Sequence, residues 1–237
     1  MRVPGHPTHF RDVPAETADG VATHRVHADP GGSGLELSVL AVDAGRTVTS
    51  RVAGGVDELL YVISGTGELQ TSTGRHLVGT DTSALANGGD DYTLTAAETS
   101  ALEVVVVTGR TDSRVACRPP VPVVDLTGQE KEAAVSGREF RVLFDPDRGC
   151  SGMTQFVGYV PAIRTPRHYH PYDEMLFIVR GEGTVEIEGR EVGVGPGHCY
   201  YLPAGCVHLV QNTQDRFLIE LGVFCPAGSP AQNTPVE

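Results

Sequence analysis

Short apolar runs separated by glycine, proline and aspartate dominate the pattern of this chain. The runs are rich in branched and aromatic residues, which is typical of β-strands, and the turn residues between them mark where strands end. We predict strands at Leu35–Val42, Leu59–Ile63, Leu102–Val107, Met153–Val160, Met175–Val179 and Phe217–Val223. Many short strands with frequent turns indicate a sandwich or a small barrel.

The chain also contains an internal repeat. Glu58–Gly67 reads ELLYVISGTG and returns at Glu174–Gly183 as EMLFIVRGEG. Upstream of it, the R-V-x-x-D-P pattern of Arg25–Pro30 returns at Arg141–Pro146. Both pairs of segments are separated by the same 116 residues. Two markers in one register indicate a duplication.

The repeat predicts the domain organisation. We expect an N-terminal barrel over residues 1–115, a linker over 116–135 and a C-terminal barrel over 136–237. The segment Arg118–Asp125 contains three prolines, which lack ladder donors, so it suits an extended connector rather than a central strand. The first dozen residues are expected to form a loose arm or an edge strand contributed to a neighbour.

Composition narrows the class of protein. The 237 residues carry a net charge of −12 with 18 basic residues, which argues against nucleic acid or an anionic membrane as partner. The five cysteines form no C-x-x-C pair, and the N-terminus shows no charged-then-apolar leader. We therefore expect a reduced, cytoplasmic protein with free, buried thiols and no membrane-spanning helix.

The later copy contains two histidines two residues apart. His168 and His170 are i and i+2, which on a strand point to the same face about 6.5–7 Å apart. Two such imidazoles can converge on one ion. Pro171 disfavours continuation of the strand, so a bend before Glu174 lets that carboxylate return to the same point.

A second segment, residues 197–212, supplies a further histidine. Pro203 and Gly205 predict a tight turn, and the strand after it carries His208 inward. Three neutral imidazoles and one carboxylate suit iron(II), manganese, nickel, cobalt or zinc, and ligand type alone does not choose among them.

Together the two segments resemble the motifs of the cupin superfamily, G-x5-H-x-H-x3–4-E-x6-G and G-x5-P-x-G-x2-H-x3-N. The second motif is matched at every fixed position, and the first lacks only its leading glycine, replaced by Ala162. The resemblance implies an all-β fold of two tandem double-stranded β-helix (cupin) barrels. It also implies one divalent metal ion, with iron(II) or manganese as the first expectation, held by His168, His170, Glu174 and His208.

The first copy has lost this ligand set. Spacing aligns Arg51 and Ala53 with the two histidines, and the second segment, Gly79–Asp90, has neither proline nor histidine. We therefore predict no metal in the N-terminal barrel. One hypothesis is that the Arg51 guanidinium takes the place of the ion and pairs with Glu58, because a buried carboxylate needs a cationic or hydrogen-bonding partner. The alternative is Arg51 turned towards solvent.

Several other polar side chains are candidates for lining the pocket. Arg164, four positions before the first histidine, is the first candidate to hold an anionic substrate. Further candidates lie in or near predicted strands around the motifs: Tyr159, Tyr172, Gln155 and Glu220. The alternative for each is a surface or packing role.

These observations favour a metal-dependent enzyme that acts on a small organic molecule. The first expectation is an oxidoreductase, specifically a dioxygenase for an anionic or hydroxylated substrate. A second is a hydrolase or isomerase similar in layout to ureidoglycine aminohydrolase, although the first ligand motif of that family begins with glutamate. A third is a non-catalytic small-molecule binding protein. We expect a homodimer that binds neither nucleic acid nor membrane.

Overall fold

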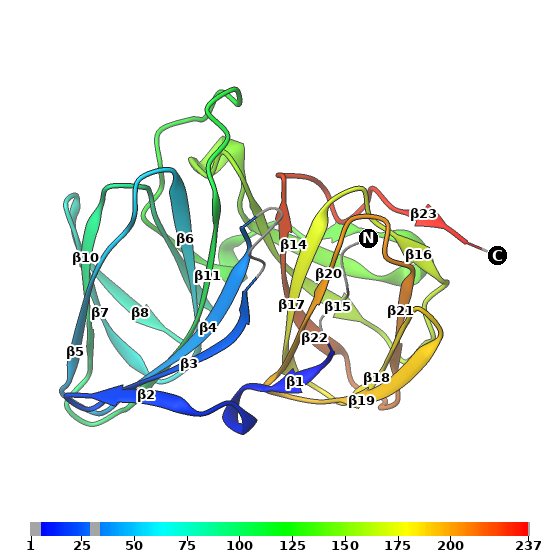
Figure 1. The fold of residues 1–237 in the computed structure, drawn as a ribbon, viewed down its shortest axis with the longest axis horizontal. Coiled ribbons are helices and arrows are strands. Elements are labelled where there is room, and N and C mark those ends of the chain that lie inside the picture. The colour runs from blue at the N-terminus through cyan, green and yellow to red at the C-terminus, as the bar shows by residue number, and fades with distance from the viewer. Residues whose placement is uncertain (1–5, 29–33, 237) are drawn as a thin grey trace.

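The chain folds as two β-barrels that lie side by side (Figure 1). The computed structural model describes residues 6–28 and 34–236, so Asp29 and Pro30 of the repeat lie outside the described residues. Within these ranges the regular structure is strands and four short 3-10 helices. The helices are η1 (Phe10–Asp12), η2 (Leu126–Gly128), η3 (Val135–Gly137) and η4 (Pro146–Arg148). The expected all-β fold of two tandem barrels is confirmed.

The N-terminal barrel consists of two sheets. Its strands are β2 (Ala15–Ala18), β3 (Val21–Ala28), β4 (Glu36–Val42), β5 (Thr47–Arg51), β6 (Val56–Ser64), β7 (Thr66–Thr71), β8 (Gly74–Gly79), β9 (Thr82–Ala86), β10 (Asp91–Ala96), β11 (Leu102–Arg110) and β12 (Val123–Asp125). The larger sheet has the order β12-β9-β6-β11-β4-β3-β2, and the smaller has the order β5-β10-β7-β8.

The C-terminal barrel repeats this plan. Its strands are β1 (Thr8–His9), β13 (Glu132–Ala133), β14 (Glu139–Phe144), β15 (Thr154–Val160), β16 (His168–Tyr169), β17 (Asp173–Arg180), β18 (Gly183–Ile187), β19 (Arg190–Val194), β20 (His198–Leu202), β21 (His208–Asn212), β22 (Leu218–Cys225) and β23 (Thr234–Pro235). The sheets have the orders β1-β20-β17-β22-β15-β14-β13 and β19-β18-β21-β16-β23.

The sequence repeat is visible in the strand pairing. Glu58 on β6 lies opposite Thr108 on β11, and Glu174 on β17 lies opposite Phe224 on β22. The two pairs are related by the same 116-residue shift as the sequence motifs. The two glutamates therefore occupy equivalent places in the two barrels.

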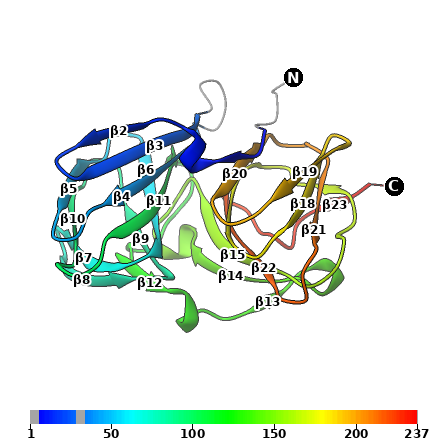
Figure 2. The same cartoon turned by 90° about the horizontal axis from the view of Figure 1, so that it is seen from below.

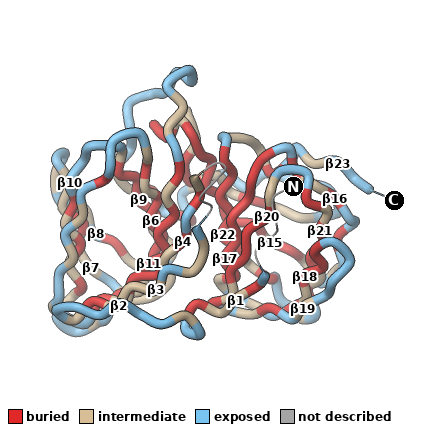
Figure 3. Tube along the Cα trace, in the orientation of Figure 1, coloured by how far each residue is buried: buried red, intermediate tan, exposed pale blue. Residues whose placement is uncertain are grey.

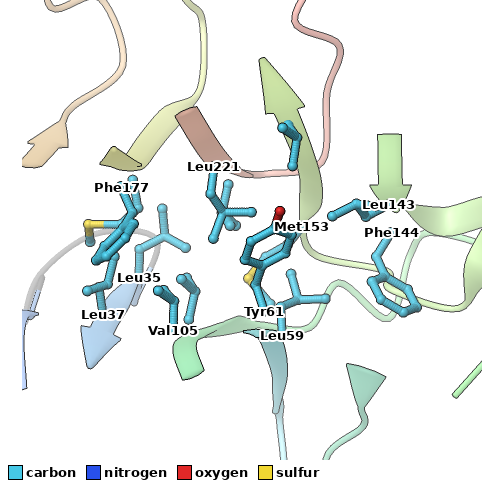
Figure 4. Packing of buried hydrophobic residues seen from close by; sticks show 14 of the residues in the cluster. Leu35, Leu37, Leu59, Tyr61, Val105, Leu143, Phe144, Met153, Phe177 and Leu221 are labelled. Atoms are coloured by element: carbon cyan, nitrogen blue, oxygen red, sulfur yellow. The ribbon is translucent and has the colours of Figure 1, made fainter. Parts of the chain in front are cut away.

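The central strands of the larger sheets are buried on both faces, which explains their continuous apolar runs. On β4, Leu37 and Val39 face a cluster shared by the two barrels, whereas Leu40 and Val42 face the interior of their own barrel. Figure 4 shows the shared cluster, with Tyr61 of the first barrel among side chains of the second. Buried residues accordingly concentrate where the barrels meet (Figure 3).

Segments outside the two repeats complete the edges of the larger sheets. The N-terminal arm adds β1 to β20 of the other barrel, with Thr8 opposite Cys199, so the expected edge strand joins a neighbour within the same chain. The proline-rich connector adds β12 at the edge of the first barrel, with Val124 opposite Ser83. Figure 2 shows the arm passing between the barrels.

All five cysteines are free, and four of them are buried, whereas Cys117 is exposed. The expectation of buried thiols is therefore wrong for Cys117, which lies in the connector. In the described ranges, no helix has both the length and the apolar character needed to cross a membrane.

Candidate metal centre

Three histidines enter the second barrel from two neighbouring strands. His168 begins β16, and it lies opposite His208 at the start of β21. His170 follows directly after β16. The tight turn expected before His208 is present, closed by a hydrogen bond from Cys206 N to Pro203 O of 2.9 Å.

The three imidazoles converge. Each offers a ring nitrogen, and these three nitrogens all lie within 4.8 Å of one another. The ring centroids of His168 and His208 are 4.4 Å apart, and those of His168 and His170 are 5.2 Å apart. All three side chains are buried. Ring nitrogens at these separations can share one ion with metal–nitrogen distances of about 2.0–2.1 Å.

Backbone carbonyls fix the orientation of all three rings. His168 Nδ1 lies 2.9 Å from Pro166 O, and His208 Nδ1 lies 3.0 Å from Cys206 O. His170 Nδ1 lies 2.8 Å from the carbonyl oxygen of Gln232, in the C-terminal segment. A carbonyl only accepts, so each Nδ1 carries the proton and each Nε2 keeps a lone pair. Such outer hydrogen bonds are typical of metal-ligating histidines.

Burial keeps these imidazoles neutral. Desolvation, followed by the charge of Arg138, lowers the pKa of His168 to about 4. Desolvation also lowers the pKa of His170 to about 4 and holds the pKa of His208 well below its usual value. Neutral imidazoles at neutral pH are the form that binds a metal ion.

Glu174 completes the polar cluster. Its Oε2 lies 3.7 Å from His208 Nε2. Among the described residues, the group of possible metal-binding atoms that all lie within 4.8 Å of one another contains the three histidines and not Glu174. The same Oε2 is buried without a hydrogen-bond partner among the described residues. Desolvation, and then the charge of Glu220, raises the pKa of Glu174 well above its ordinary value. A buried, unsatisfied carboxylate oxygen beside three imidazole lone pairs fits a divalent cation.

The sequence reasoning missed Arg138, which lies at the edge of the cluster. Its Nη1 lies 3.5 Å from His168 Nε2, and its Nε donates to Val135 O at 3.2 Å. Desolvation lowers the pKa of Arg138, while the charges of Glu220 and Glu174 act in the opposite direction. Arg138 comes from the end of the connector, just before β14, where no motif marks it.

A small pocket joins these groups. It has a volume of about 30 Å³, and its lining includes the three histidines, Glu174, Glu220 and Arg138, with apolar walls that include Phe156 and Phe224. A volume of about 10–15 Å³ suffices for one water molecule, so the pocket has room for very small groups only. Desolvation raises the pKa of Glu220 to about 7, and the charge of Arg138 opposes that rise.

Arg164 does not line this pocket, and its candidacy as substrate anchor is wrong. Its guanidinium is 44% exposed and pairs with Glu186 at 2.7 Å and Glu191 at 2.9 Å. It also donates to Gln211 Oε1 at 2.8 Å. Arg164 pairs with Gln211 further along β21, whereas His168 pairs with His208 at the start of that strand, so closeness in sequence does not bring Arg164 into the site.

Of the three remaining candidates for lining the pocket, one does so and two do not. Tyr159 lines the pocket as expected. Tyr172 lies behind it, with its ring stacked 6.2 Å from that of His170 and its hydroxyl donating to the Gln232 side chain. Gln155 is buried against Ser83 of the other barrel. Tyr172 therefore supports a histidine and Gln155 joins the barrels, and neither reaches the pocket.

In the N-terminal barrel, the hypothesis that Arg51 pairs with Glu58 is wrong. Arg51 is 74% exposed and pairs with Asp91 at 3.2 Å. Glu58 instead accepts a hydrogen bond from Tyr92 Oη at 2.9 Å. A neutral hydroxyl thus satisfies the carboxylate for which a cation was expected.

The alignment behind that hypothesis is out of register. Val52 O accepts a hydrogen bond from Gly89 N at 3.0 Å, just as His170 O accepts one from Gly205 N at 2.9 Å. The two glycines are related by the 116-residue shift, so Val52, and not Ala53, takes the place of His170.

The neighbouring strand pair agrees with this register. Ser50 lies opposite Tyr92, as His168 lies opposite His208, and Tyr92 and His208 are related by the same 116-residue shift. The first copy therefore carries serine, valine and tyrosine where the second carries its three histidines. The loop before Glu58 is two residues longer than the loop before Glu174, and this difference misled the spacing argument.

Comparisons with known proteins agree with this architecture. Residues 155–221 match the model of the cupin domain. An uncharacterized protein of Aquifex aeolicus is 25% identical over 119 residues, which cover 50% of this chain and 95% of that protein. Structures of oxalate decarboxylase from Bacillus subtilis match all of this chain and 80% of theirs, with 15% identity and a TM-score of 0.77. One of these structures concerns the Mn(II) centres of that enzyme.

Residues 155–221 thus match the cupin domain, and the whole chain, with its two tandem barrels, is similar in fold to oxalate decarboxylase. At 15% identity the likeness to oxalate decarboxylase concerns the fold. What the site does must be argued from its own residues.

Proposed function

We propose that the C-terminal barrel is the active site of a metal-dependent enzyme whose substrate is a small carboxylate. The observation that carries the proposal is the convergence of His168, His170 and His208 beside the Arg138 guanidinium. The three Nε2 atoms and Glu174 Oε2 are the proposed metal ligands, and the unsatisfied oxygen of Glu174 supports its part. The proposed ion is manganese or iron(II), and manganese is the metal of the oxalate decarboxylase centres.

Arg138 is the proposed anchor for the substrate carboxylate. Its planar guanidinium offers paired donors that match a carboxylate, and it lines the same pocket as the histidines. The carboxylate would also relieve the cost of burying this cation. A pocket of about 30 Å³ favours a substrate of only a few carbon atoms.

The pocket residues also prepare the site for chemistry. Phe156 and Phe224 keep water away from its inner wall, which strengthens every charge interaction there. Glu220, a buried carboxyl group outside the proposed ligand set, is placed to hold or give a proton. When bound, a divalent ion supplies Lewis-acid or redox chemistry to a coordinated substrate oxygen.

Two reaction classes fit this arrangement. The dioxygenase expected from the sequence requires dioxygen as co-substrate. Decarboxylation is the second candidate: the bond between carbon and the carboxylate breaks, carbon dioxide leaves, and Glu220, which lines the pocket with the proposed anchor, is placed to supply the proton that replaces it. Oxalate decarboxylase also shares the fold. The hydrolase and isomerase alternatives draw on the same Lewis acid. That the protein forms a homodimer in the cytoplasm stays a prediction.

The test uses the full chain loaded with manganese or with iron(II). A panel of small mono- and dicarboxylates is assayed in parallel for oxygen uptake and for carbon dioxide release, which separates the two reaction classes. Arg138→Gln should raise KM by about tenfold or more, because a charged hydrogen bond to the substrate is lost. Arg164→Gln is the matched control and should leave KM unchanged. Absence of turnover across the panel, or an unchanged KM in Arg138→Gln, would overturn the proposal.

A further inference from the structure

The N-terminal barrel contains a cavity at the place where its twin gathers the histidines. Its volume is about 320 Å³, against about 30 Å³ for the pocket of the C-terminal barrel. Polar groups line one part of it and apolar groups the rest. The lining residues that matter here are Ser50, Glu58, Tyr92, Leu40, Val48 and Val106.

The cavity is open because one large side chain is replaced. Thr108 lines it and lies opposite Glu58, where the other barrel has Phe224 opposite Glu174. Phe224 is fully buried and packs its ring 4.9 Å from that of His170. The smaller threonine, together with the loss of the histidines, leaves room that the C-terminal barrel fills.

Arg25, Glu36 and Glu58 line the cavity, and the Glu58 carboxyl group has no paired countercharge among the described residues. Glu58 accepts a hydrogen bond from Tyr92 and forms no ion pair within the described residues. Arg25, at the rim, lies 3.5 Å from the Glu16 carboxylate. Burial raises the pKa of Glu58, and the hydrogen bond from Tyr92 only partly opposes that rise. A cation that enters the cavity would favour the ionised form of Glu58, because an opposite charge opposes the effect of burial.

The other residues that line the cavity indicate which chemical groups a ligand would carry besides its cation. Leu40, Val48 and Val106 offer an apolar wall, which favours a hydrocarbon group of modest size. Ser50 and Tyr92 place hydroxyl groups close to Glu58, and the Ser50 side chain interacts with the Tyr92 hydroxyl. The polar and apolar parts lie within one chamber, so a single molecule can contact both.

We propose that the N-terminal barrel is a metal-independent binding site for a small organic ammonium compound. The ammonium group binds Glu58 beside the Tyr92 hydroxyl, and the hydrocarbon part packs on Leu40, Val48 and Val106. The loss of the histidines has thus exchanged a metal site for an organic-cation site in the same barrel position. This inference does not depend on the activity of the C-terminal barrel.

The test uses three probes of one skeleton: benzylamine, benzyl alcohol and benzoate. Each is titrated into the full chain with isotope-labelled leucine and valine methyl groups, followed by nuclear magnetic resonance. Benzylamine should shift the methyl signals of Leu40, Val48 and Val106 with a dissociation constant in the millimolar range, as suits a fragment of this size. Benzyl alcohol should bind about tenfold more weakly, and benzoate should leave these signals unmoved.

Three variants test whether benzylamine binds at Glu58. Glu58→Gln keeps the shape and an acceptor for Tyr92, and it should weaken benzylamine about tenfold, to the level of the alcohol. Glu68→Gln, outside the cavity lining, and Glu174→Gln, in the other barrel, should leave benzylamine binding unchanged. Equal binding of amine and alcohol, stronger binding of benzoate, or unchanged binding in Glu58→Gln would overturn the proposal.

A filled cavity gives an independent check. Thr108→Phe introduces the aromatic ring that the other barrel carries at Phe224, and it should abolish the benzylamine shifts. Thermal unfolding of Thr108→Phe serves as the control that tests whether this variant is folded. Benzylamine shifts that persist in folded Thr108→Phe, or no benzylamine shifts in the unsubstituted chain, would also overturn the proposal.

Discussion

The two barrels share one backbone plan and differ in what fills it. In the C-terminal barrel, three histidines and Phe224 leave about 30 Å³. In the N-terminal barrel, Thr108 and smaller polar residues leave about 320 Å³. The glutamate at the centre is common to both, opposite Phe224 in one barrel and opposite Thr108 in the other.

The difference shows how a duplicated scaffold can separate two kinds of binding. In the C-terminal barrel Glu174 Oε2 lies 3.7 Å from a neutral imidazole nitrogen of His208, and both atoms suit a metal ion. In the N-terminal barrel Glu58 lies 2.9 Å from the hydroxyl of Tyr92, which satisfies the carboxylate without an ion. The strand pairing that positions the two side chains is the same in both barrels.

The largest expected effect is the loss of metal when His208 is given the residue of its counterpart. His208→Tyr removes a ring nitrogen and offers Glu174 a hydroxyl instead. Metal affinity should fall by more than about 100-fold, since even outer-shell changes at metal sites cost about 10–100-fold. Elemental analysis after dialysis measures it, and His76→Ala in the other barrel is the control. If His208→Tyr holds as much metal as the unsubstituted protein, His208 is not a metal ligand, and the two barrels do not differ in this way.

Next in size is the stability cost of opening the C-terminal barrel. Phe224 is fully buried, so Phe224→Thr should destabilise the fold by about 3 kcal/mol or more through lost burial and a new cavity. Thr108→Phe should cost less than about 1.5 kcal/mol, since its ring enters space that is already present. Urea unfolding compares the two. Equal costs would mean that the two interiors do not differ in packing.

A smaller effect is expected from restoring ligands to the N-terminal barrel. The combined substitutions Ser50→His, Val52→His and Tyr92→His place imidazoles at the three positions that the strand register identifies. A second and weaker site should raise metal binding from about one to about two ions per chain at saturation. Binding that stays at one ion would show that the register alone does not position the ligands. The same chain with Arg51→His in place of Ser50→His is the matched control.

The smallest effect concerns the pH dependence of stability at Glu58. Burial raises its pKa above the ordinary value of 4.5, so the folded chain holds this proton more tightly than the unfolded chain does. Its favourable contribution is therefore complete below pH 4.5 and declines as pH rises towards the folded pKa. Glu58→Gln lacks this decline, so its stability relative to the unsubstituted protein should improve with rising pH. Denaturant titrations across this range measure it, and a constant difference would contradict the assignment.

Local patterns in the sequence sufficed for the strands, and the resemblance to the cupin motifs gave the two tandem barrels. The six predicted strands overlap β4, β6, β11, β15, β17 and β22, because their apolar runs reflect burial on both sheet faces. The histidines of the candidate site were also predictable, because His168, His170 and His208 stand at spacings that the strand geometry brings together. The strands and the His168–His170 pair depend on residues close together in sequence, whereas the second motif supplied His208.

The residues that were misjudged depend on contacts between distant segments. Arg138 reaches the pocket because the connector ends beside β14, a route that no spacing encodes. Gln155 faces Ser83 of the other barrel, since its strand lies at the surface shared by the two halves. Arg51 was placed one residue out of register because a loop differs in length between the copies.

The pairing of β1 with β20 has a consequence for the order of folding. Thr8 and Cys199, which are paired across these strands, are separated by 191 residues. Such a contact closes a loop that spans most of the chain, and its entropic cost is repaid only after β20 has been built into its sheet. The arm should therefore dock last, and amide hydrogens in β1 should exchange with solvent before those of the strands around it.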